Sequence, residues 1–487
     1  MILAKNNIIV KIAPSIKEKD RDEYKDDYDY AILNPVSGSF DIMDKNEYAM
    51  LKNLANASKP DDDFIAYLLE RGYAYKDHNA EKATITQAQS RFEIEVNNSQ
   101  IQLLLIPTYG CNLACGYCFQ QGIADKSALV TKETVDAFFA YIRKNFAALG
   151  KQKPFITLFG GEPLINSRAQ RKIISYIIDR CAAEDYELAV VTNGYDLIDY
   201  VEILKKFKIK EIQVTLDGSR FVHDTRRAKA NKEGTFDRIV SGVEAAIKQK
   251  MPINLRSVVD LENITDLVNL AEFLEEKGWL SLPPQLFKTQ IGRNYELIDC
   301  YAKPQHLMTQ IELWGQYASL CKQHPVLTKF HRPDFKGIRK LVDTGEMYMA
   351  SFDTCPACKT EWVFDLHGKI YGCTASCGRE EYPLGTYWPE VNLNQASIQT
   401  WQNRDVTTIP KCIDCKYDVI CGGGCGVVAA NKNKGEILAP DCRPIQELIE
   451  IGVNYYFEDI KGMTAQVEQK NPANGSSCCN HATGPTQ

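Results

Sequence analysis

Several features that would place a protein on nucleic acid or in a membrane are missing from this sequence of 487 residues. Basic residues are not in excess, because 57 Lys and Arg stand against 63 Asp and Glu and the net charge is −6. This balance argues against a nucleic-acid binder. No apolar run reaches membrane-spanning length, and the N-terminal stretch MILAKNNIIV lacks the long apolar core and cleavage site of a signal peptide. We therefore expect a soluble cytoplasmic protein that contacts neither nucleic acid nor membrane.

Histidine is scarce, whereas cysteine is abundant. The seven histidines are scattered and form no grouping with cysteine of the kind that binds zinc. The 17 cysteines suit metal binding or redox chemistry better than disulfides, because the cytoplasm is reducing. Three of them lie between Cys111 and Cys118, and nine lie between Cys355 and Cys442. We therefore look for the chemistry in these two stretches.

The N-terminal part of the chain predicts a small domain of its own, over residues 1–85. Short strands are expected at 7–12, 30–33 and 39–42, followed by a helix that Asp44 caps and a second helix at 62–70. This order is typical of a winged-helix unit. Residues 86–100 are polar and are interpreted as a linker.

From residue 101 the sequence predicts the α/β class. Apolar strands are expected at 101–106, 155–158, 187–191, 211–216, 253–259 and 285–288, and helices lie between them. Repeated strand–helix units imply parallel strands with right-handed crossovers, so we expect a partial (β/α)6 TIM barrel over 101–300. A helical connection is expected at 301–352, a Cys- and Gly-rich unit of short hairpins at 353–455, and a helix end with a disordered tail at 456–487.

The first cysteine group has the spacing C-x3-C-x2-C, at Cys111, Cys115 and Cys118. It follows the first barrel strand, so it faces the carboxyl end of the sheet, where active sites of such folds gather. Three thiolates would leave one iron of a 4Fe–4S cluster open to a small chelating molecule, as catalytic zinc keeps an open position. Three buried cysteines, or a cluster with a distant fourth thiolate, are the alternatives at this point.

The sequence CNLACGYC resembles the CxxxCxxC signature of radical SAM enzymes, in which an aromatic residue precedes the third cysteine. In that family the open iron binds the amino and carboxylate groups of S-adenosylmethionine (SAM). An electron from the cluster then cleaves SAM and releases a 5′-deoxyadenosyl radical, while the protein restricts what the radical meets. The resemblance implies a SAM-binding 4Fe–4S cluster on these cysteines and places Tyr117 beside the adenine.

A second motif, Gly160-Gly161-Glu162-Pro163, follows the second expected strand. Glycine allows close approach of the backbone to a ligand, and a carboxylate can receive an ammonium group. The motif resembles the GGEP element that holds the SAM amino group in this family. That role is therefore carried to Gly160, Gly161 and Glu162.

Polar residues also end the later strands of the expected barrel. Thr215-Leu216-Asp217-Gly218 and the following HDTRR resemble the S-L-D-G and H-D-x-x-R elements of related maturases, with Thr215 in place of serine. The resemblance assigns Asn193, Thr215 and Asp217 to the ribose or substrate region. It assigns Arg227 to the SAM carboxylate, with Arg256 as the second choice. A capping or turn role is the alternative for each, and His223 could equally be a satisfied surface residue.

The C-terminal cysteines have the spacing Cys358-x9-Gly368-x4-Cys373, then Cys412-x2-Cys415-x5-Cys421-x3-Cys425 and, after a gap, Cys442. This spacing resembles the seven-cysteine pattern of SPASM domains, which occur on radical SAM enzymes that modify peptides. With one further upstream cysteine there are eight thiolates, enough for two 4Fe–4S clusters. The division implied by the family is Cys355, Cys358, Cys373 and Cys425 for one cluster, and Cys412, Cys415, Cys421 and Cys442 for the other. The spacing Gly372-x4-Cys377 competes with Gly368-x4-Cys373, and we prefer Cys373 because a hairpin over 364–371 would end there. A zinc ribbon is the alternative for the CxxC pairs.

The remaining candidates carry less chemistry. Cys181, Cys300 and Cys321 fall in helical patterns and are expected in the core, whereas Cys478 and Cys479 lie in the polar tail. Four polar residues are expected near the barrel mouth without an assigned catalytic role: Tyr295, Asp299, His331 and Asp334.

The N-terminal unit resembles the winged-helix recognition element of maturases that act on ribosomal peptides. There a leader peptide adds as a strand to the small sheet. The combined resemblance implies a peptide maturase that forms a thioether or carbon–carbon crosslink, with a precursor peptide and a donor such as flavodoxin or ferredoxin as partners. The alternatives are a sulfatase-type maturase that forms formylglycine, a non-catalytic iron–sulfur electron carrier or redox sensor, and a peptide-binding scaffold that uses only residues 1–85.

Overall fold

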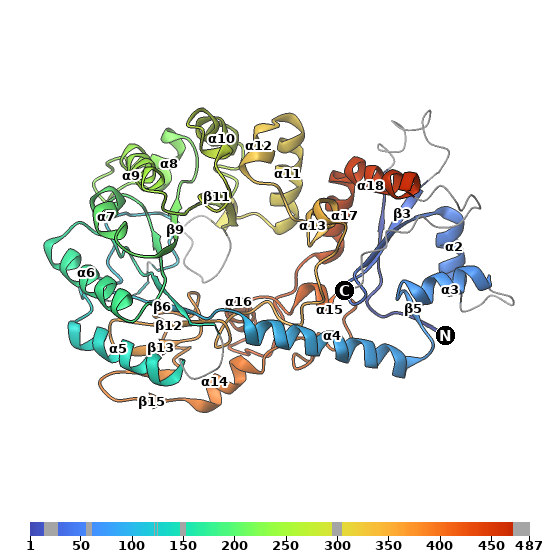
Figure 1. Ribbon diagram of the computed structural model, residues 1–487, viewed down its shortest axis with the longest axis horizontal. Coiled ribbons are helices and arrows are strands. Elements are labelled where there is room, and N and C mark those ends of the chain that lie inside the picture. The colour runs from blue at the N-terminus through green and yellow to red at the C-terminus, as the bar shows by residue number, and fades with distance from the viewer. Residues whose placement is uncertain are drawn as a thin grey trace.

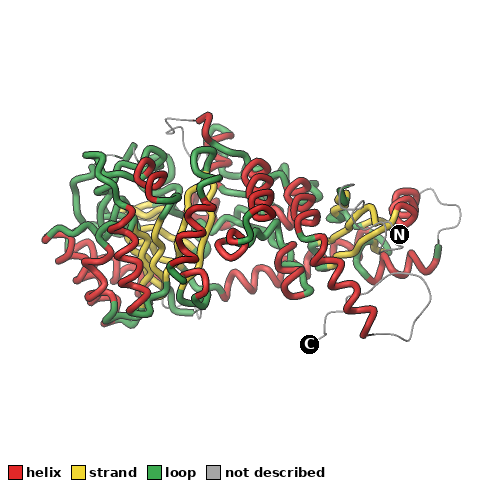
Figure 2. Tube along the Cα trace, turned by 90° about the horizontal axis from the view of Figure 1, so that it is seen from above, coloured by secondary structure: helices red, strands yellow, loops and turns green. Residues whose placement is uncertain are grey.

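The computed structural model describes residues 1–13, 28–54, 61–120, 122–123, 125–146, 152–294 and 304–470. The molecule is elongated, with the large curved sheet at one end and the N-terminal unit at the other (Figure 1). Figure 2 shows the same division from above. Tyr295, Asp299, Cys300, Cys478 and Cys479, together with the tail expected to be disordered, lie outside the described residues.

Six parallel strands form the large sheet in the order β11-β10-β9-β8-β7-β6. The strands are β6 (Gln102–Leu105), β7 (Phe155–Leu158), β8 (Leu188–Thr192), β9 (Ile209–Thr215), β10 (Ile253–Val259) and β11 (Phe287–Arg293). The helices between them are α5 (Lys132–Asn145), α6 (Arg168–Ala183), α7 (Leu197–Leu204), α8 (Arg220–Arg226), α9 (Phe236–Lys248) and α10 (Leu267–Glu276). The six strand–helix units are therefore confirmed. The last strand starts at residue 287 and runs to 293, further than the expected 285–288.

Most side chains of the parallel strands are buried on both faces of the sheet, as in β6 and β7, and an alternation of buried and partly exposed residues is visible on β9. Ile212 and Val214 of β9 are fully buried, whereas Gln213 between them is partly exposed. The covering helices present matching apolar stripes, such as Ile173 and Ile177 of α6.

The C-terminal unit extends the same sheet. Strand β12 (Glu361–Phe364) pairs in parallel with β6, and β13 (Lys369–Tyr371), β14 (Gly385–Thr386) and β15 (Asn392–Leu393) continue antiparallel. The expected hairpin is present. Its attachment beside β6 was not predictable from local pattern, because it joins segments about 260 residues apart. The helices of this unit are α14 (Gln395–Gln402), α15 (Asp418–Cys421), α16 (Gly426–Lys432), α17 (Ile445–Tyr455) and α18 (Phe457–Lys470).

The expected helical connection contains α11 (Gln310–Gln323), α12 (Val326–Phe330) and α13 (Ile338–Thr344), with short 3₁₀ turns at Trp279–Ser281 and Pro304–His306. His331 and Asp334 lie within its packing. His331 stacks on Trp314, and Asp334 accepts from the backbone of Gly337. Within the described residues, no helix has the length and apolarity needed to cross a membrane.

The N-terminal unit is a three-stranded antiparallel sheet, ordered β2 (Ile8–Lys11), β3 (Tyr28–Asn34), β4 (Ser39–Asp44). Helices α2 (Lys45–Asn53) and α3 (Asp62–Glu70) follow, and β1 (Ile2–Leu3) pairs with β5 (Ala74–Tyr75). Asp44 caps α2 in a capping box. The region interpreted as a polar linker belongs to a helix, α4 (His78–Asn98), whose partly buried Phe92 packs on the C-terminal unit.

Candidate functional site

The loop that carries Cys111 is held by the GGEP turn. It follows β6 directly, and the Gly161 and Glu162 amides donate to the carbonyls of Thr108 and Gly110 at 3.0 and 2.8 Å. A Cβ at Gly161 would lie 2.2 Å from the Gly110 oxygen. This position therefore requires glycine because two backbones pack against each other, before any ligand is considered.

The three thiols of this loop interact with one another. Burial raises the pKa of Cys111 to about 12, and the charges of Glu162, Cys115 and Cys118 add to the effect. Burial also raises the pKa of Cys115, against the lowering effect of Arg227. Thiols in this state bind as thiolates only when a metal supplies the compensating charge.

Glu162 is buried beneath the loop, where burial raises its pKa to about 7. Its carboxylate accepts hydrogen bonds from the amides of Leu164 and Asn193 and from the hydroxyl of Thr192, at 2.8, 2.6 and 2.6 Å. A carboxylate has about four acceptor positions. The side chain is thus rigidly placed and keeps capacity for one further donor.

Asn193, at the end of β8, contacts the cysteine loop directly. Its Nδ2 donates to Asn112 Oδ1 at 2.7 Å and approaches Cys111 Sγ at 3.7 Å. Asn112 in turn donates to Asp196 at 3.1 Å. Asn112 and Asp196 were not expected from the sequence. The position of Asn112 next to a cysteine was the only signal.

Tyr117, Asp217 and Arg227 come together at the carboxyl end of β9. The Tyr117 hydroxyl donates to Asp217 and accepts from Arg227 Nη1 at 2.5 Å. Asp217 and Arg227 are buried and Tyr117 is half-buried, and the guanidinium of Arg227 lies 5.9 Å from the Tyr117 ring centre. Arg227 Nε has no hydrogen-bond partner within the described residues. The resemblance assigned these three residues to different parts of the SAM site, and the structure brings them into contact with one another.

Arg226 was not singled out from the sequence, although it stands beside Arg227. It lies 5.1 Å from the Tyr117 ring centre and forms two hydrogen bonds with Asp260, at 2.8 and 2.9 Å. Asp217 lies 3.5 Å from its Nε. The ion pair of Arg226 and Asp260 thus holds the Arg226 guanidinium against the Tyr117 ring.

His223 is fully buried and therefore not a surface residue. Its Nδ1 accepts from the Asp217 amide at 3.2 Å and its Nε2 lies 3.0 Å from the Thr235 hydroxyl, which donates to the Arg227 carbonyl. Burial lowers the pKa of His223 to about 3. A neutral ring thus fastens the backbones of Asp217 and Arg227 to each other.

Thr215 and Arg256 lie side by side on β9 and β10. The Arg256 guanidinium fits against Gly292, where a Cβ would come within 2.6 Å of Nη2. Tyr117 contacts Arg226 and Arg227 instead. The structure therefore separates the two arginines that sequence reasoning offered for one role.

The C-terminal thiols fall into two electrostatically linked groups. Burial raises the pKa of Cys358 and of Cys373, and in both cases Cys355 adds to it; Cys373 also interacts with Cys425. Burial raises the pKa of Cys412 to about 11, and the charges of three neighbouring thiols raise it further. Those three are Cys421, Cys415 and Cys442. These neighbours belong to the same two sets that the resemblance implies, and the sets stay predictions as cluster ligands.

Cys377 has different neighbours. Its sulfur lies 3.3 Å from the Tyr109 hydroxyl, which donates to Asp365 at 3.1 Å. Burial raises its pKa, with Asp365 and Glu361 as the charged neighbours that add to it. The side chain thus sits between the first cysteine loop and the β12–β13 hairpin, apart from the other thiols.

No three His, Cys, Asp or Glu side chains among the described residues are arranged to hold a single metal ion. A four-iron cluster is much larger than one ion and holds its thiolates further apart. Three thiol groups of three, four and four members, with buried backbone amides between Cys421 and Cys425, fit such clusters.

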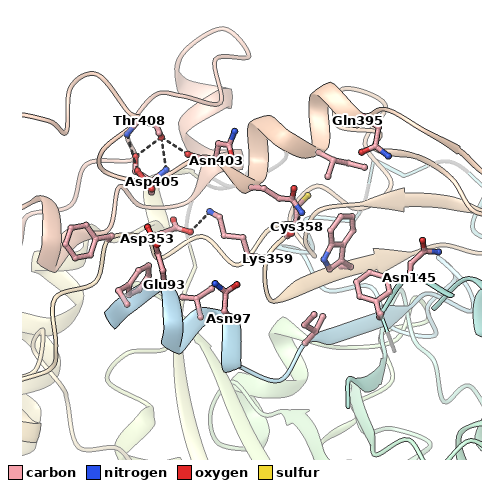
Figure 3. Close-up of a pocket in the computed structure, with 18 of the residues that line it drawn as sticks. Glu93, Asn97, Asn145, Asp353, Cys358, Lys359, Gln395, Asn403, Asp405 and Thr408 are labelled. Carbon is pink, nitrogen blue, oxygen red and sulfur yellow. Dashed lines mark hydrogen bonds and ion pairs between the residues drawn. The ribbon is translucent and has the colours of Figure 1, made fainter. Parts of the chain in front are cut away.

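A pocket of about 690 Å³ lies on the outer side of the C-terminal unit, between α4 and α14 (Figure 3). Cys358 lines it together with Trp362 and the ion pair of Lys359 and Asp353. The first predicted auxiliary site therefore borders a solvent-accessible cavity.

Comparison with known proteins identifies a domain over the part of the chain that carries this site. The family model of the Radical SAM superfamily matches residues 105–274. The chain therefore carries a radical SAM domain, the catalytic core of an enzyme. A radical SAM domain implies a 4Fe–4S cluster and SAM.

The individual proteins that match this chain have low sequence identity to it. The GTP 3′,8-cyclase of Campylobacter jejuni is 29% identical over 174 residues, which are 35% of this chain and 51% of the relative. The chain thus spans about half the length of the first curated relatives it matches. The cysteine-type anaerobic sulfatase-maturating enzyme of Clostridium novyi is 22% identical over 348 residues, covering 67% of this chain and 87% of the relative.

Among solved structures, "Native anSMEcpe with bound AdoMet and Cp18Cys peptide" is similar in fold. Its TM-score is 0.57 at 16% identity, over 76% of this chain and 100% of that one. "Native anSMEcpe with bound AdoMet" gives a TM-score of 0.55 at 18% identity, over 75% and 100%.

Proposed function

We propose that this protein is a radical SAM peptide maturase that installs a crosslink, thioether or carbon–carbon, in a ribosomally made precursor peptide. The observation that carries the proposal is the convergence of the cysteine loop, Glu162 and the Tyr117–Asp217–Arg227 group on one end of the sheet. When bound, the cluster and SAM supply a radical that abstracts hydrogen from the substrate.

The residues of this chain bind and orient. Cys111, Cys115 and Cys118 would hold the cluster. Glu162, with one acceptor position left, would receive the SAM ammonium, beside Gly160 and Gly161. Arg227, with an unsatisfied Nε, would bind the SAM carboxylate. Tyr117 would lie beside the adenine, and Asn193 and Thr215 near the ribose.

Two auxiliary 4Fe–4S clusters on the eight C-terminal thiolates would serve oxidation. Fully thiolated clusters cannot bind substrate through an open iron, but they can accept the electron that a substrate radical must lose. The electron donor for the first cluster would be a flavodoxin or a ferredoxin.

The small N-terminal sheet would recognise a leader peptide by strand addition. Its β2 edge is closed, because Gln446 of α17 donates to the Ile9 carbonyl at 2.6 Å and Asn454 bonds both Lys11 and Ala13. Strand β4 is the other edge, and no strand of the described chain pairs with its outer side. The leader would therefore add at β4.

A sulfatase-type maturase, which oxidises cysteine or serine to formylglycine, is the second candidate. The similarity in fold to anSMEcpe over 76% of the chain favours it. The two products differ in chemistry, because formylglycine is an aldehyde and a crosslink is not.

The test is incubation of the anaerobically reconstituted enzyme with SAM, dithionite and the peptide encoded by a neighbouring short reading frame. We expect a mass loss of two hydrogens, a fragmentation pattern that lacks cleavage inside the crosslinked loop, and no reaction with a hydrazide. An aldehyde captured by the hydrazide would instead establish the second candidate. Removal of residues 1–75 should abolish turnover of the leader-bearing peptide, and undiminished turnover would refute leader recognition.

A further inference from the structure

A buried arginine, Arg404, lies against the turn between Cys421 and Cys425 that joins the two auxiliary cysteine groups. Arg404 follows α14, and its side chain is fully buried. Its guanidinium donates four hydrogen bonds, at 2.8 to 3.1 Å, and every acceptor is a backbone carbonyl. The acceptors belong to Ile437, Gly424, Gly423 and Ala439. No carboxylate of the described residues forms an ion pair with it.

Among the described residues, no carboxylate is therefore paired with this guanidinium to offset its charge. Carbonyl dipoles solvate a cation, but a buried charge remains costly unless an opposite charge accompanies it. Asp353 is close enough for Arg404 to lower its pKa against the effect of burial, yet Asp353 is ion-paired with Lys359. The Lys359 ammonium also donates to the Arg404 carbonyl, so this pair adds no net negative charge.

The turn that Arg404 binds joins the two cysteine groups. Gly422, Gly423 and Gly424 connect Cys421 with Cys425, at φ of +64°, +71° and +71°. Three successive left-handed residues are accessible to glycine alone at low cost. All three glycines are buried, and within the described part of the chain the amides of Gly423 and Gly424 find no acceptor. Such unpaired backbone amides at a turn form anion-binding sites.

We propose that Arg404 is a positioning residue and the shared counter-charge of both auxiliary clusters. It binds the carbonyls of the 422–424 turn, which leaves the amides of that turn as donors to cluster sulfurs, and its positive charge offsets the negative charge of two thiolate-bound clusters. The inference rests on the proposed auxiliary clusters. Asn403 and Asp405, which precede and follow Arg404 in the chain, line the pocket in Figure 3.

Charge and hydrogen bonding can be separated with two substitutions. Arg404→Met removes both, whereas Arg404→Lys keeps the charge and loses the planar fork. Arg91→Met is the control, because Arg91 is exposed on α4 and removes an equal charge from the surface. Each enzyme is reconstituted anaerobically, its iron and sulfide are counted, and the midpoint potential of each cluster is measured by electron paramagnetic resonance.

We expect Arg404→Met to lower the midpoint potentials of both auxiliary clusters, because loss of a positive charge disfavours the reduced state. The potential of the Cys111 cluster should be unchanged. Arg404→Lys should keep the auxiliary potentials close to those of wild type, and Arg91→Met should match wild type. If Arg404→Met does not accumulate in folded form, the Arg404→Lys enzyme decides alone. It should then load all clusters at near wild-type potentials.

Two results would overturn the proposal while leaving the auxiliary clusters intact. One is full iron loading with unmoved auxiliary potentials in Arg404→Met. The other is an equal shift in the Met and Lys variants, which would assign the effect to packing. A wild-type chain that binds only about four irons, in place of about twelve for three clusters, would instead refute the auxiliary clusters and the counter-charge with them.

Discussion

Replacing Gly161 by alanine should displace the loop that carries the first cysteine group. The added Cβ would lie 2.2 Å from the Gly110 oxygen and 2.3 Å from the Tyr109 oxygen, where real Cβ atoms stay beyond 3.0 Å. Both obstacles are backbone atoms, so no side chain can rotate away. One of the two segments must shift by about 0.8 Å. Strain of this kind costs about 1–3 kcal/mol.

The consequence is measurable as lost cluster binding and lost SAM cleavage. About 1.4 kcal/mol corresponds to a tenfold change in rate. If the strain falls on the SAM site, we expect Gly161→Ala to cleave SAM about 5- to 150-fold more slowly and to lose iron from the first site. Gly116→Ala is the matched control, because it lies in the same loop and its Cβ would meet nothing within 4 Å. The reasoning is refuted if both variants load iron and cleave SAM at the wild-type rate.

Three further predictions follow from individual contacts. Lys5 donates to Asp418 and to the Ile413 carbonyl at 2.7 and 2.6 Å. Lys5→Met should lower the free energy of unfolding by about 1 kcal/mol and speed the removal of iron by a chelator, whereas the control Lys11→Met should do neither. Equal rates of iron removal in the two variants would contradict this. Burial lowers the pKa of His223 from 6.5 to about 3, so the unfolded chain takes up a proton that the folded protein does not. As the pH falls below 6.5, the free energy of unfolding of wild type should therefore fall relative to that of His223→Asn, by up to about 1.4 kcal/mol per pH unit. An equal dependence of unfolding free energy on pH in the two proteins would contradict this. Cys373→Ser should lose about four irons whereas Cys377→Ser keeps them, and the reverse result would exchange their roles.

Much of the barrel was predictable because its signals are local. Alternating strand and helix patterns identify six units, and the end of each strand marks where polar residues gather. Tyr117, Asp217 and Arg227, which span more than 100 residues of the chain, were each assigned by resemblance to a part of the SAM site, but their mutual contact was not predicted. Parallel topology brings the ends of such strands to one edge of the sheet.

The remainder depends on contacts between distant segments. No pattern in the neighbouring sequence indicates that β12 pairs with β6, or that Gln446 donates a hydrogen bond to the edge of β2. The same holds for Arg404, whose importance appears only through its burial and the absence of a carboxylate among its described contacts. The helix α4 was interpreted as a linker because its residues are polar and its apolar stripe is narrow.

The most direct test of the account is SAM cleavage by the reconstituted, dithionite-reduced protein. We predict release of 5′-deoxyadenosine by wild type. We predict none from the Cys111→Ala, Cys115→Ala or Cys118→Ala variants, each of which should keep about eight irons on the auxiliary sites. If wild type released no 5′-deoxyadenosine, or if the variants released as much as wild type, the central claim that these three cysteines hold a SAM-binding cluster would be contradicted.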